Sequence, residues 1–114
     1  HMHARWKTLE SLSQLDEAIQ HSSTTTQIIF KHSTRCIISK MVLKNFEEQW
    51  SALPDNADAL FLDLLQFREL SNILAEQLHV KHESPQVIVV RNGKAVYHAS
   101  HDSINTHDVA QHCA

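Results

Sequence analysis

The sequence predicts an α/β domain with a four-stranded mixed sheet, two parallel strands plus a β-hairpin, flanked by about four helices. Short β-branched runs alternate with helical apolar stripes, and the last two of these runs flank an Asn-Gly pair. The 114 residues, of which 42% are apolar and 20% charged, suit one core. We therefore expect a single domain over residues 1–114, in which His1-Met2 resembles a cloning remnant.

The first predicted helix and strand lie before residue 32. Ser13 followed by Asp16 resembles a capping box, so we expect a helix over about 13–21. The run QIIFK at residues 27–31 is short, apolar and β-branched, which is typical of a strand buried on both faces.

A second helix and a second strand follow Cys36. Apolar residues recur every four positions and predict a helix that reaches about residue 50: Ile38, Val42, Phe46 and Trp50. Pro54-Asp55 indicates a turn, and ALFLDLL at residues 59–65 indicates another buried strand.

The second half of the chain predicts a helix, a hairpin and a closing helix. A mostly apolar stripe from Leu70 to Leu78 predicts the first of these helices. Apolar runs at 86–90 and 94–99 flank Asn92-Gly93, a pair that suits the positive φ angles of a type I′ turn. Thr106 is a plausible cap for a short helix to about residue 113.

This order of elements restricts the topology. Two strands joined through a helix are parallel with a right-handed crossover, and the hairpin adds two antiparallel strands. A mixed sheet with helices on both faces is the simplest closed arrangement, and it is that of the thioredoxin fold. In that fold a reactive cysteine lies at the end of the first core strand, where this sequence has Cys36.

Cys36 stands where a strand ends and a helix begins. At the first turn of a helix, its sulfur can face the free N–H groups of Ile38 and Ser39 and the positive end of the helix dipole. Both effects favour the thiolate, and Arg35 and His32 can add to them. We therefore expect Cys36 to be a nucleophile rather than a core residue.

Ser39 occupies the position at which a Cys-x-x-Cys pair has its second thiol. A serine can donate a hydrogen bond to a thiolate, but it cannot form a disulfide. Chemistry at Cys36 would then stop at a mixed disulfide, which an outside thiol must release.

Pro85 comes immediately before a predicted buried strand. In a thioredoxin fold a proline at this place is typically cis and lies beside the active cysteine. It leaves the backbone of the preceding residue, here Ser84, free to pair with an extended substrate segment. We expect a cis peptide bond between Ser84 and Pro85.

Four short blocks make the sequence similar to a known family. The segments KHSTRCIIS, LSN, VKHESPQ and ASH resemble the YtxJ-type monothiol bacilliredoxin family, and the resemblance runs from about Trp6 to the end. It implies a thioredoxin-like fold and removal of a low-molecular-weight thiol, bacillithiol in particular, from S-thiolated proteins. It also implies Cys36 as nucleophile, Ser39 at the vacant resolving position and Ser84-Pro85 as the adjacent loop.

Two positions depart from the family pattern. Ile37 stands where the family has proline after the cysteine, which adds an N–H and exposed apolar bulk. His79 stands where a glycine often ends the helix, which indicates a different exit or a histidine in the left-handed conformation.

Other residues have more than one interpretation. Arg68, Ser71 and Asn72 are either contacts for the small thiol or partner, or, in the case of Ser71-Asn72, a local backbone-bonding pair near a helix start. The large aromatic residues are expected to be packing residues: Trp6, Phe46 and Trp50.

Composition excludes several classes of partner and site. Two cysteines 77 positions apart make neither a disulfide framework nor a zinc site, and they suit a reducing cytoplasm. The ten histidines include no strong ligand motif, and we expect the nearest cluster, His107, His112 and Cys113 at a frayed C-terminus, to be solvated rather than a metal site. A net charge of -3 and the lack of a long apolar run argue against nucleic-acid and membrane partners.

Two alternatives to thiol–disulfide exchange remain open from the sequence. Cys-x-x-Ser proteins of the monothiol glutaredoxin type can hold an iron–sulfur cluster between two protomers. A redox-inactive interaction module of thioredoxin fold is the other alternative, and the missing proline at Ile37 favours it.

Overall fold

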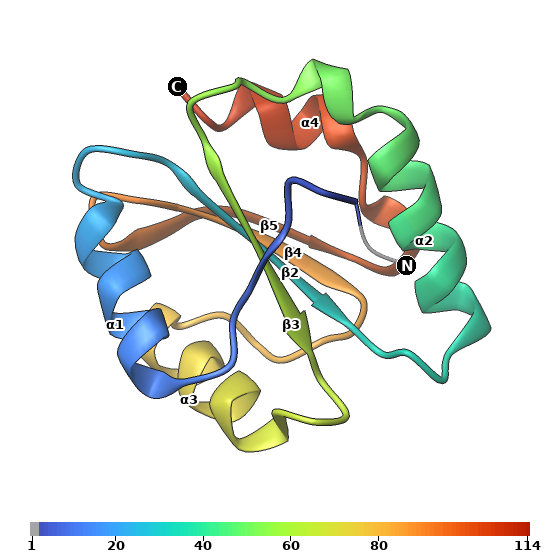
Figure 1. Ribbon diagram of the computed structural model, residues 1–114, viewed down its shortest axis with the longest axis horizontal. Helices are drawn as coiled ribbons and strands as arrows, with labels where there is room; N and C mark the ends of the chain where they lie inside the picture. The colour runs from blue at the N-terminus through green and yellow to red at the C-terminus, as the bar shows by residue number, and fades with distance from the viewer. Residues whose placement is uncertain (1–2) are drawn as a thin grey trace.

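The computed structural model describes residues 3–114 and shows a central sheet between two layers of helices (Figure 1). The interpretation of His1-Met2 as a cloning remnant lies outside the described residues. The elements follow in chain order: β1 (Lys7–Thr8), α1 (Leu12–His21), β2 (Gln27–His32), α2 (Ile37–Glu48), the 3-10 turn η1 (Trp50–Ala52), β3 (Asp58–Asp63), α3 (Arg68–Leu78), β4 (Gln86–Arg91), β5 (Lys94–Ser100), the 3-10 turn η2 (His101–Ser103) and α4 (Thr106–Gln111).

The sheet has five strands in the order β1-β3-β2-β4-β5. The expected parallel pair is β2 with β3, and the expected antiparallel hairpin is β4 with β5. The prediction of four strands is short by one, because β1 adds a parallel edge strand with Lys7 opposite Leu60 and Thr8 opposite Phe61. Two exposed polar residues form no strand pattern in the sequence, so the pairing partner alone defines β1.

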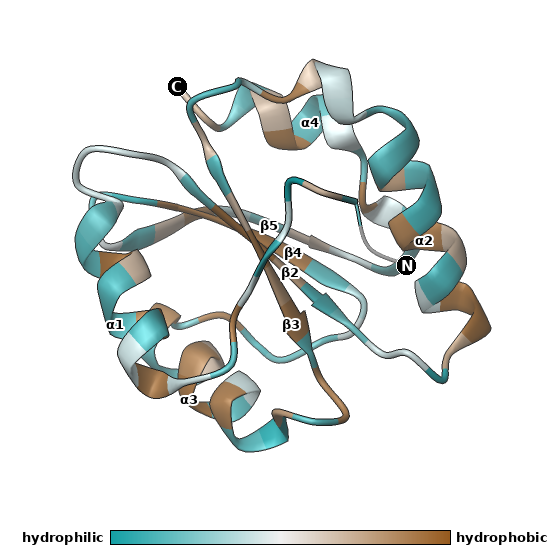
Figure 2. Ribbon diagram, in the orientation of Figure 1, coloured by the Kyte–Doolittle hydropathy of each residue, from teal (hydrophilic) through white to brown (hydrophobic). Residues whose placement is uncertain are grey.

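The central strands are buried on both faces. Along β2, Ile28 and Phe30 point into an aromatic core under α2 and α4, whereas Ile29 points into an aliphatic core under α1 and α3. Figure 2 accordingly shows brown, hydrophobic ribbon where the central strands cross. This two-sided burial explains why the strands are nearly continuous apolar runs in the sequence.

Two predicted helix caps are wrong by one or two residues. Ser11, not Ser13, caps α1, because its extended backbone lets its hydroxyl accept from the N–H of Gln14. Asn105 caps α4 by accepting from the N–H of Asp108. Thr106, the predicted cap, instead donates its hydroxyl proton to the carbonyl of Phe46 at 2.9 Å and joins α4 to α2.

The second helix differs from its predicted apolar stripe at both ends. Phe46 is buried in the aromatic core, but α2 ends at Glu48 and Trp50 lies in η1. Ile38 is 60% exposed, so it does not belong to the buried stripe. In the first turn of α2 it is the next residue, Ser39, that faces the sheet and is fully buried, so Ile38 faces outward.

The tight turns follow the predicted chemistry. Asn92 and Gly93 have φ angles of 52° and 75°, as a type I′ hairpin turn requires. His79 ends α3 with φ 56° and ψ 41°, so the second alternative for this position is confirmed: a histidine adopts the left-handed conformation.

The expectation of a frayed C-terminus with a solvated cluster is wrong for Cys113 and His112, although His107 is exposed as expected. Cys113 is buried in the aromatic core and donates its S–H to the Val109 carbonyl at 3.3 Å, and His112 stacks on Tyr97. Within the described residues, no three metal-ligating side chains gather at one site. Over residues 3–114, the helices are too short or too polar to cross a bilayer.

Trp6 is the centre of the aromatic core and gives a test of it. Its indole packs against the rings of Phe30, Phe46, Trp50 and Phe61. We expect Trp6→Ala to lower the free energy of unfolding by about 3–5 kcal/mol, as measured by urea titration. Leu12→Ala, at a 45% exposed position, should change it by no more than about 0.5 kcal/mol. Equal effects of the two substitutions would contradict this core.

Candidate active site

The predicted site residues lie at one end of the sheet. His32 pairs with Asp63 in β3, and Lys31 pairs with Gln86 in β4. Because β2 and β4 are antiparallel and their pairing ends at Lys31 and Gln86, the end of β2 and the start of β4 lie at the same end of the sheet. The carboxyl end of β2 therefore meets the segment before β4.

A turn brings Cys36 back to the same place. The N–H of Cys36 donates to the carbonyl of Ser33 at 3.2 Å, which closes a turn whose first and last Cα atoms lie within about 7 Å. Because Ser33 directly follows β2 and Ser84-Pro85 directly precedes β4, Cys36 and the Ser84-Pro85 segment lie at the same end of the sheet. The peptide bond between Ser84 and Pro85 is cis, as expected.

Cys36 is the N-cap of α2 and is half-buried. Its backbone is extended, with φ −98° and ψ 121°, and its carbonyl accepts from the N–H of Lys40. This is the expected position at the positive end of the helix. The expected hydrogen bonds are not present, because the sulfur accepts from no amide of the first turn.

Ser39 points away from the predicted role of thiolate donor. Its hydroxyl is fully buried, lies 2.7 Å from Nδ1 of His32 and accepts from the N–H of Ser33 at 3.2 Å. Burial lowers the pKa of His32, although the Asp63 and Glu47 carboxylates act in the opposite direction. The pair joins the turn before Cys36 to the first turn of α2, so it fixes the orientation of the cysteine.

An apolar surface surrounds the start of α2. Ile37 is 74% exposed, and Ile38 and Met41 are each 60% exposed. Figure 2 shows this end of α2 in brown. Arg35, predicted as a supporting residue, and Lys40 are exposed in the same part of the chain. Such a patch beside a nucleophile favours contact with another protein.

The backbone of Ser84 is available for pairing. Among residues 3–114, no group forms a hydrogen bond with the N–H or the carbonyl of Ser84, and its buried Oγ also has no partner. The next carbonyl, that of Pro85, accepts from the N–H of His101 at 2.9 Å. The segment is thus held on its β5 side, and the Ser84 peptide groups are free.

Sequence reasoning missed a second polar cluster behind this segment. Lys31 is fully buried, and its Nζ lies 2.9 Å from Nδ1 of His82. Buried Ser71 of α3 has its Oγ 3.5 Å from the same nitrogen, so this hydroxyl bonds to His82 and not to the local backbone, contrary to the second interpretation of Ser71-Asn72. Burial lowers the pKa of Lys31 to about 8, with Glu83 opposing, and burial together with Lys31 and Arg68 lowers that of His82.

The four resembling blocks contained the signal for this cluster. Lys31 comes from KHSTRCIIS, Ser71 from LSN, and His82 and Glu83 from VKHESPQ. Ser100, from ASH, donates its hydroxyl proton to the Glu83 carboxylate. All four blocks therefore meet at the segment that precedes Pro85, a convergence that only the fold reveals.

The other cysteine is out of reach of Cys36. The Cys113 carbonyl accepts from the Thr26 hydroxyl, just before the start of β2, whereas Cys36 follows the end of that strand. Seven residues of extended chain between Thr26 and Ser33 span about 23 Å, and a disulfide requires Cα atoms within about 7 Å. Burial also raises the pKa of Cys113.

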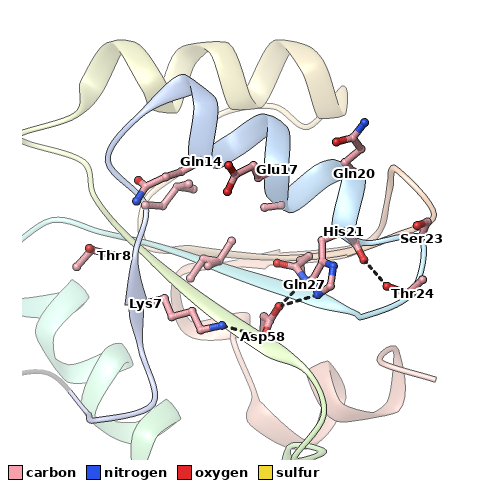
Figure 3. A pocket seen from close by; sticks show the side chains of 13 residues that line it. Lys7, Thr8, Gln14, Glu17, Gln20, His21, Ser23, Thr24, Gln27 and Asp58 are labelled. Atoms are coloured by element: carbon pink, nitrogen blue, oxygen red, sulfur yellow. Dashed lines mark hydrogen bonds and ion pairs between the residues drawn. The ribbon is translucent and has the colours of Figure 1, made fainter.

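A polar pocket at the opposite end of the sheet is separate from this site. It has a cavity volume of about 610 Å³ and lies between α1 and the starts of β2 and β3 (Figure 3). Asp58 accepts hydrogen bonds there from Gln27 at 2.9 Å and Lys7 at 3.3 Å. Burial would raise the pKa of Asp58, but these bonds and the nearby Lys7 and His21 charges lower it. No predicted site residue lines this pocket.

Solved structures resemble this arrangement over nearly the whole chain. One, described as a candidate oxidoreductase with a thioredoxin fold, is 30% identical with a TM-score of 0.80 and covers 95% of this chain and 93% of its own. Thioredoxin from Schistosoma mansoni is 17% identical, with a TM-score of 0.72 over 97% of this chain and 100% of its own. Thioredoxin from Trypanosoma brucei brucei is 17% identical, with a TM-score of 0.72 over 98% and 93%. These two show the fold alone.

The family comparison is more specific than the structural one. Residues 7–109 match the family described as Monothiol bacilliredoxin BrxC. Together with the oxidoreductase neighbour, this match supports a thiol oxidoreductase, and it confirms the resemblance that the four sequence blocks indicated. The chain belongs to the monothiol bacilliredoxin family.

Proposed function

We propose that this protein removes a low-molecular-weight thiol, of the bacillithiol type, from S-thiolated proteins by thiol–disulfide exchange at Cys36. One observation supports this most directly: Cys36 is a single half-buried thiol at a helix start, at the same end of the sheet as the unpaired backbone of Ser84. A helix N-terminus favours the thiolate, which is the attacking species.

The first step transfers the small thiol to the enzyme. The Cys36 thiolate attacks the small-thiol sulfur of the protein mixed disulfide and forms a new S–S bond. The old S–S bond breaks, and its electron pair leaves with the protein sulfur, which then takes a proton. The freed protein is reduced, and Cys36 carries the small thiol.

The second step needs an outside thiol. Ser39 at the resolving position has no sulfur, and Cys113 lies at the other end of β2. A second small thiolate attacks the small-thiol sulfur on Cys36, a symmetric small-molecule disulfide leaves, and the Cys36 thiolate is restored. The small thiol is therefore the co-substrate, and the reaction belongs in a reducing compartment such as the cytoplasm.

The geometry also supports a protein as the first substrate. An extended segment of a partner can pair with the free Ser84 peptide groups. The exposed side chains of Ile37, Ile38 and Met41 offer apolar contact on the other side of the sulfur.

The choice of small thiol can be measured by intact mass. Reduced protein is incubated separately with oxidised bacillithiol, glutathione disulfide and coenzyme A disulfide. We expect one adduct per chain, formed mainly with bacillithiol, in the wild type and in Cys113→Ala. Cys36→Ser should form none, because Cys113 is buried and bonded to a carbonyl. Adducts of equal yield in Cys36→Ser would contradict the assignment of Cys36.

The single-thiol mechanism is tested by restoring a second thiol. In Ser39→Cys, residues 36 and 39 lie one turn apart, within reach of a strained but common Cys-x-x-Cys disulfide. We expect the adduct on Cys36 to be displaced intramolecularly, so that intact mass shows an oxidised chain two hydrogens lighter and little adduct. Ser39→Ala, the matched control, should retain the adduct. A persistent adduct in Ser39→Cys would show that residue 39 is not at the resolving position.

A further inference from the structure

The segment 81–85 has no helical or strand hydrogen bonds of its own. Besides the backbone bond from the His101 N–H to the Pro85 carbonyl, side chains from neighbouring elements hold it. Gln86 donates from Nε2 to the Lys81 carbonyl at 3.1 Å and accepts at Oε1 from the N–H of Glu83 at 3.4 Å. Ser100 of β5 donates to the Glu83 carboxylate. The position of Ser84 therefore depends on side-chain contacts.

Lys31 makes the deepest of these contacts. An ammonium group has only donors, so the 2.9 Å contact requires Nδ1 of His82 to be an acceptor, with the imidazole neutral. A charged donor makes this bond stronger than a neutral pair would. Because Lys31 is fully buried on the central strand β2, it anchors His82 to the middle strand of the sheet.

The same lysine does not touch the sulfur. Cys36 lies in the turn that follows β2, whereas the Lys31 side chain points to the sheet face covered by α3, where it meets His82 and lies near Ser71. Its influence on the reaction must therefore pass through His82 to the Ser84 backbone.

We propose that Lys31 is a positioning residue, whose buried amine holds His82 and thereby sets the unpaired Ser84 backbone for pairing with an extended protein substrate. This rests on the proposed function. It assigns Lys31 and His82 to selection of protein over small disulfides, because a small disulfide without peptide groups makes no use of Ser84.

Stability against pH tests whether Lys31 is buried as a cation. Its pKa falls from 10.5 to about 8, so between these values the unfolded chain binds a proton that the folded chain does not. Unfolding free energy therefore rises with pH across that window. Between pH 7.5 and 10, we expect the urea midpoint of the wild type to rise relative to that of Lys31→Met, since methionine does not titrate. Lys94→Met, at the exposed first residue of β5, should follow the wild type. Parallel curves for Lys31→Met and wild type would contradict the buried cation.

Kinetics with two substrates test the positioning role. One substrate is a small protein carrying bacillithiol on a single cysteine, and the other is hydroxyethyl disulfide, which has no peptide groups. For Lys31→Met we expect KM for the protein substrate to rise about tenfold, the effect of one lost hydrogen bond, with kcat within about threefold. Its kcat/KM for hydroxyethyl disulfide, and that of the control Lys94→Met for both substrates, should equal the wild-type values.

The ratio of KM for the protein substrate to KM for hydroxyethyl disulfide should also depend on pH in the wild type but not in Lys31→Met. The charged and titratable groups near Lys31 are His82 and Glu83, with Arg68 next to His82. As pH passes about 8, the amine loses its charge, the bond to His82 weakens, and KM for the protein substrate should rise relative to that for the small one. In Lys31→Met the ratio should be flat.

A second variant keeps the test decisive if Lys31→Met folds poorly. His82 is only half-buried, and His82→Leu removes the acceptor. We expect the same selective rise in KM, and a double variant no worse than either single one, because both act through one contact. Equal losses on both substrates, no loss on either, or additive effects would overturn the positioning role. Wild-type protein inactive on both substrates would instead overturn the proposed function.

Discussion

Two adjacent polar side chains at the end of a central strand determine this site. Lys31 and His32 end β2, a strand covered by helices on both faces, and each is at most 4% exposed. A buried polar group without a partner costs about 1–3 kcal/mol, so each needs a hydrogen bond. The two-residue period of a strand sends them to opposite layers, His32 to Ser39 of α2 and Lys31 to His82.

Each of these bonds fixes one side of the reaction site. The His32–Ser39 contact ties the turn that contains Cys36 to α2, which also accounts for a serine at the position of a second thiol. The Lys31–His82 contact ties the segment with Ser84 to the sheet. Cys36 and the Ser84 backbone are thus each connected, through one side-chain contact, to consecutive residues of the central strand.

Much of the fold can be predicted from the sequence, because the spacing of apolar residues along the chain indicates which side chains are buried. The apolar runs of β2, β3 and β4, the stripe of α3 and the Asn92-Gly93 turn each have a local cause. β1 does not, because Lys7-Thr8 is a strand only through its pairing with β3. Ile38 likewise fits the period of the α2 stripe, but in that turn Ser39 takes the buried position and Ile38 is exposed.

The site was less predictable than the fold, because hydrogen-bond partners lie far apart in the chain. The N-cap position of Cys36 and the cis bond before Pro85 follow from local sequence and fold together. The partner of Ser39 does not follow from local sequence. Its hydroxyl bonds to His32 rather than to the Cys36 sulfur, and only the packing of α2 against the end of β2 shows this. Lys31 and His82 are 51 positions apart, so no spacing rule connects them.

The contact between Ser39 and His32 also bears on the presence of isoleucine rather than proline at position 37. Proline at the first helical position would restrict φ and stiffen the start of α2. In this chain the first turn is already held by the bond between Ser39 and His32, so the backbone direction at Cys36 does not depend on residue 37. The side chain of Ile37 is then free to serve another purpose, and its 74% exposure adds apolar surface directly beside the sulfur. Isoleucine at this position thus lacks the stiffness of proline but adds exposed apolar surface at the start of α2.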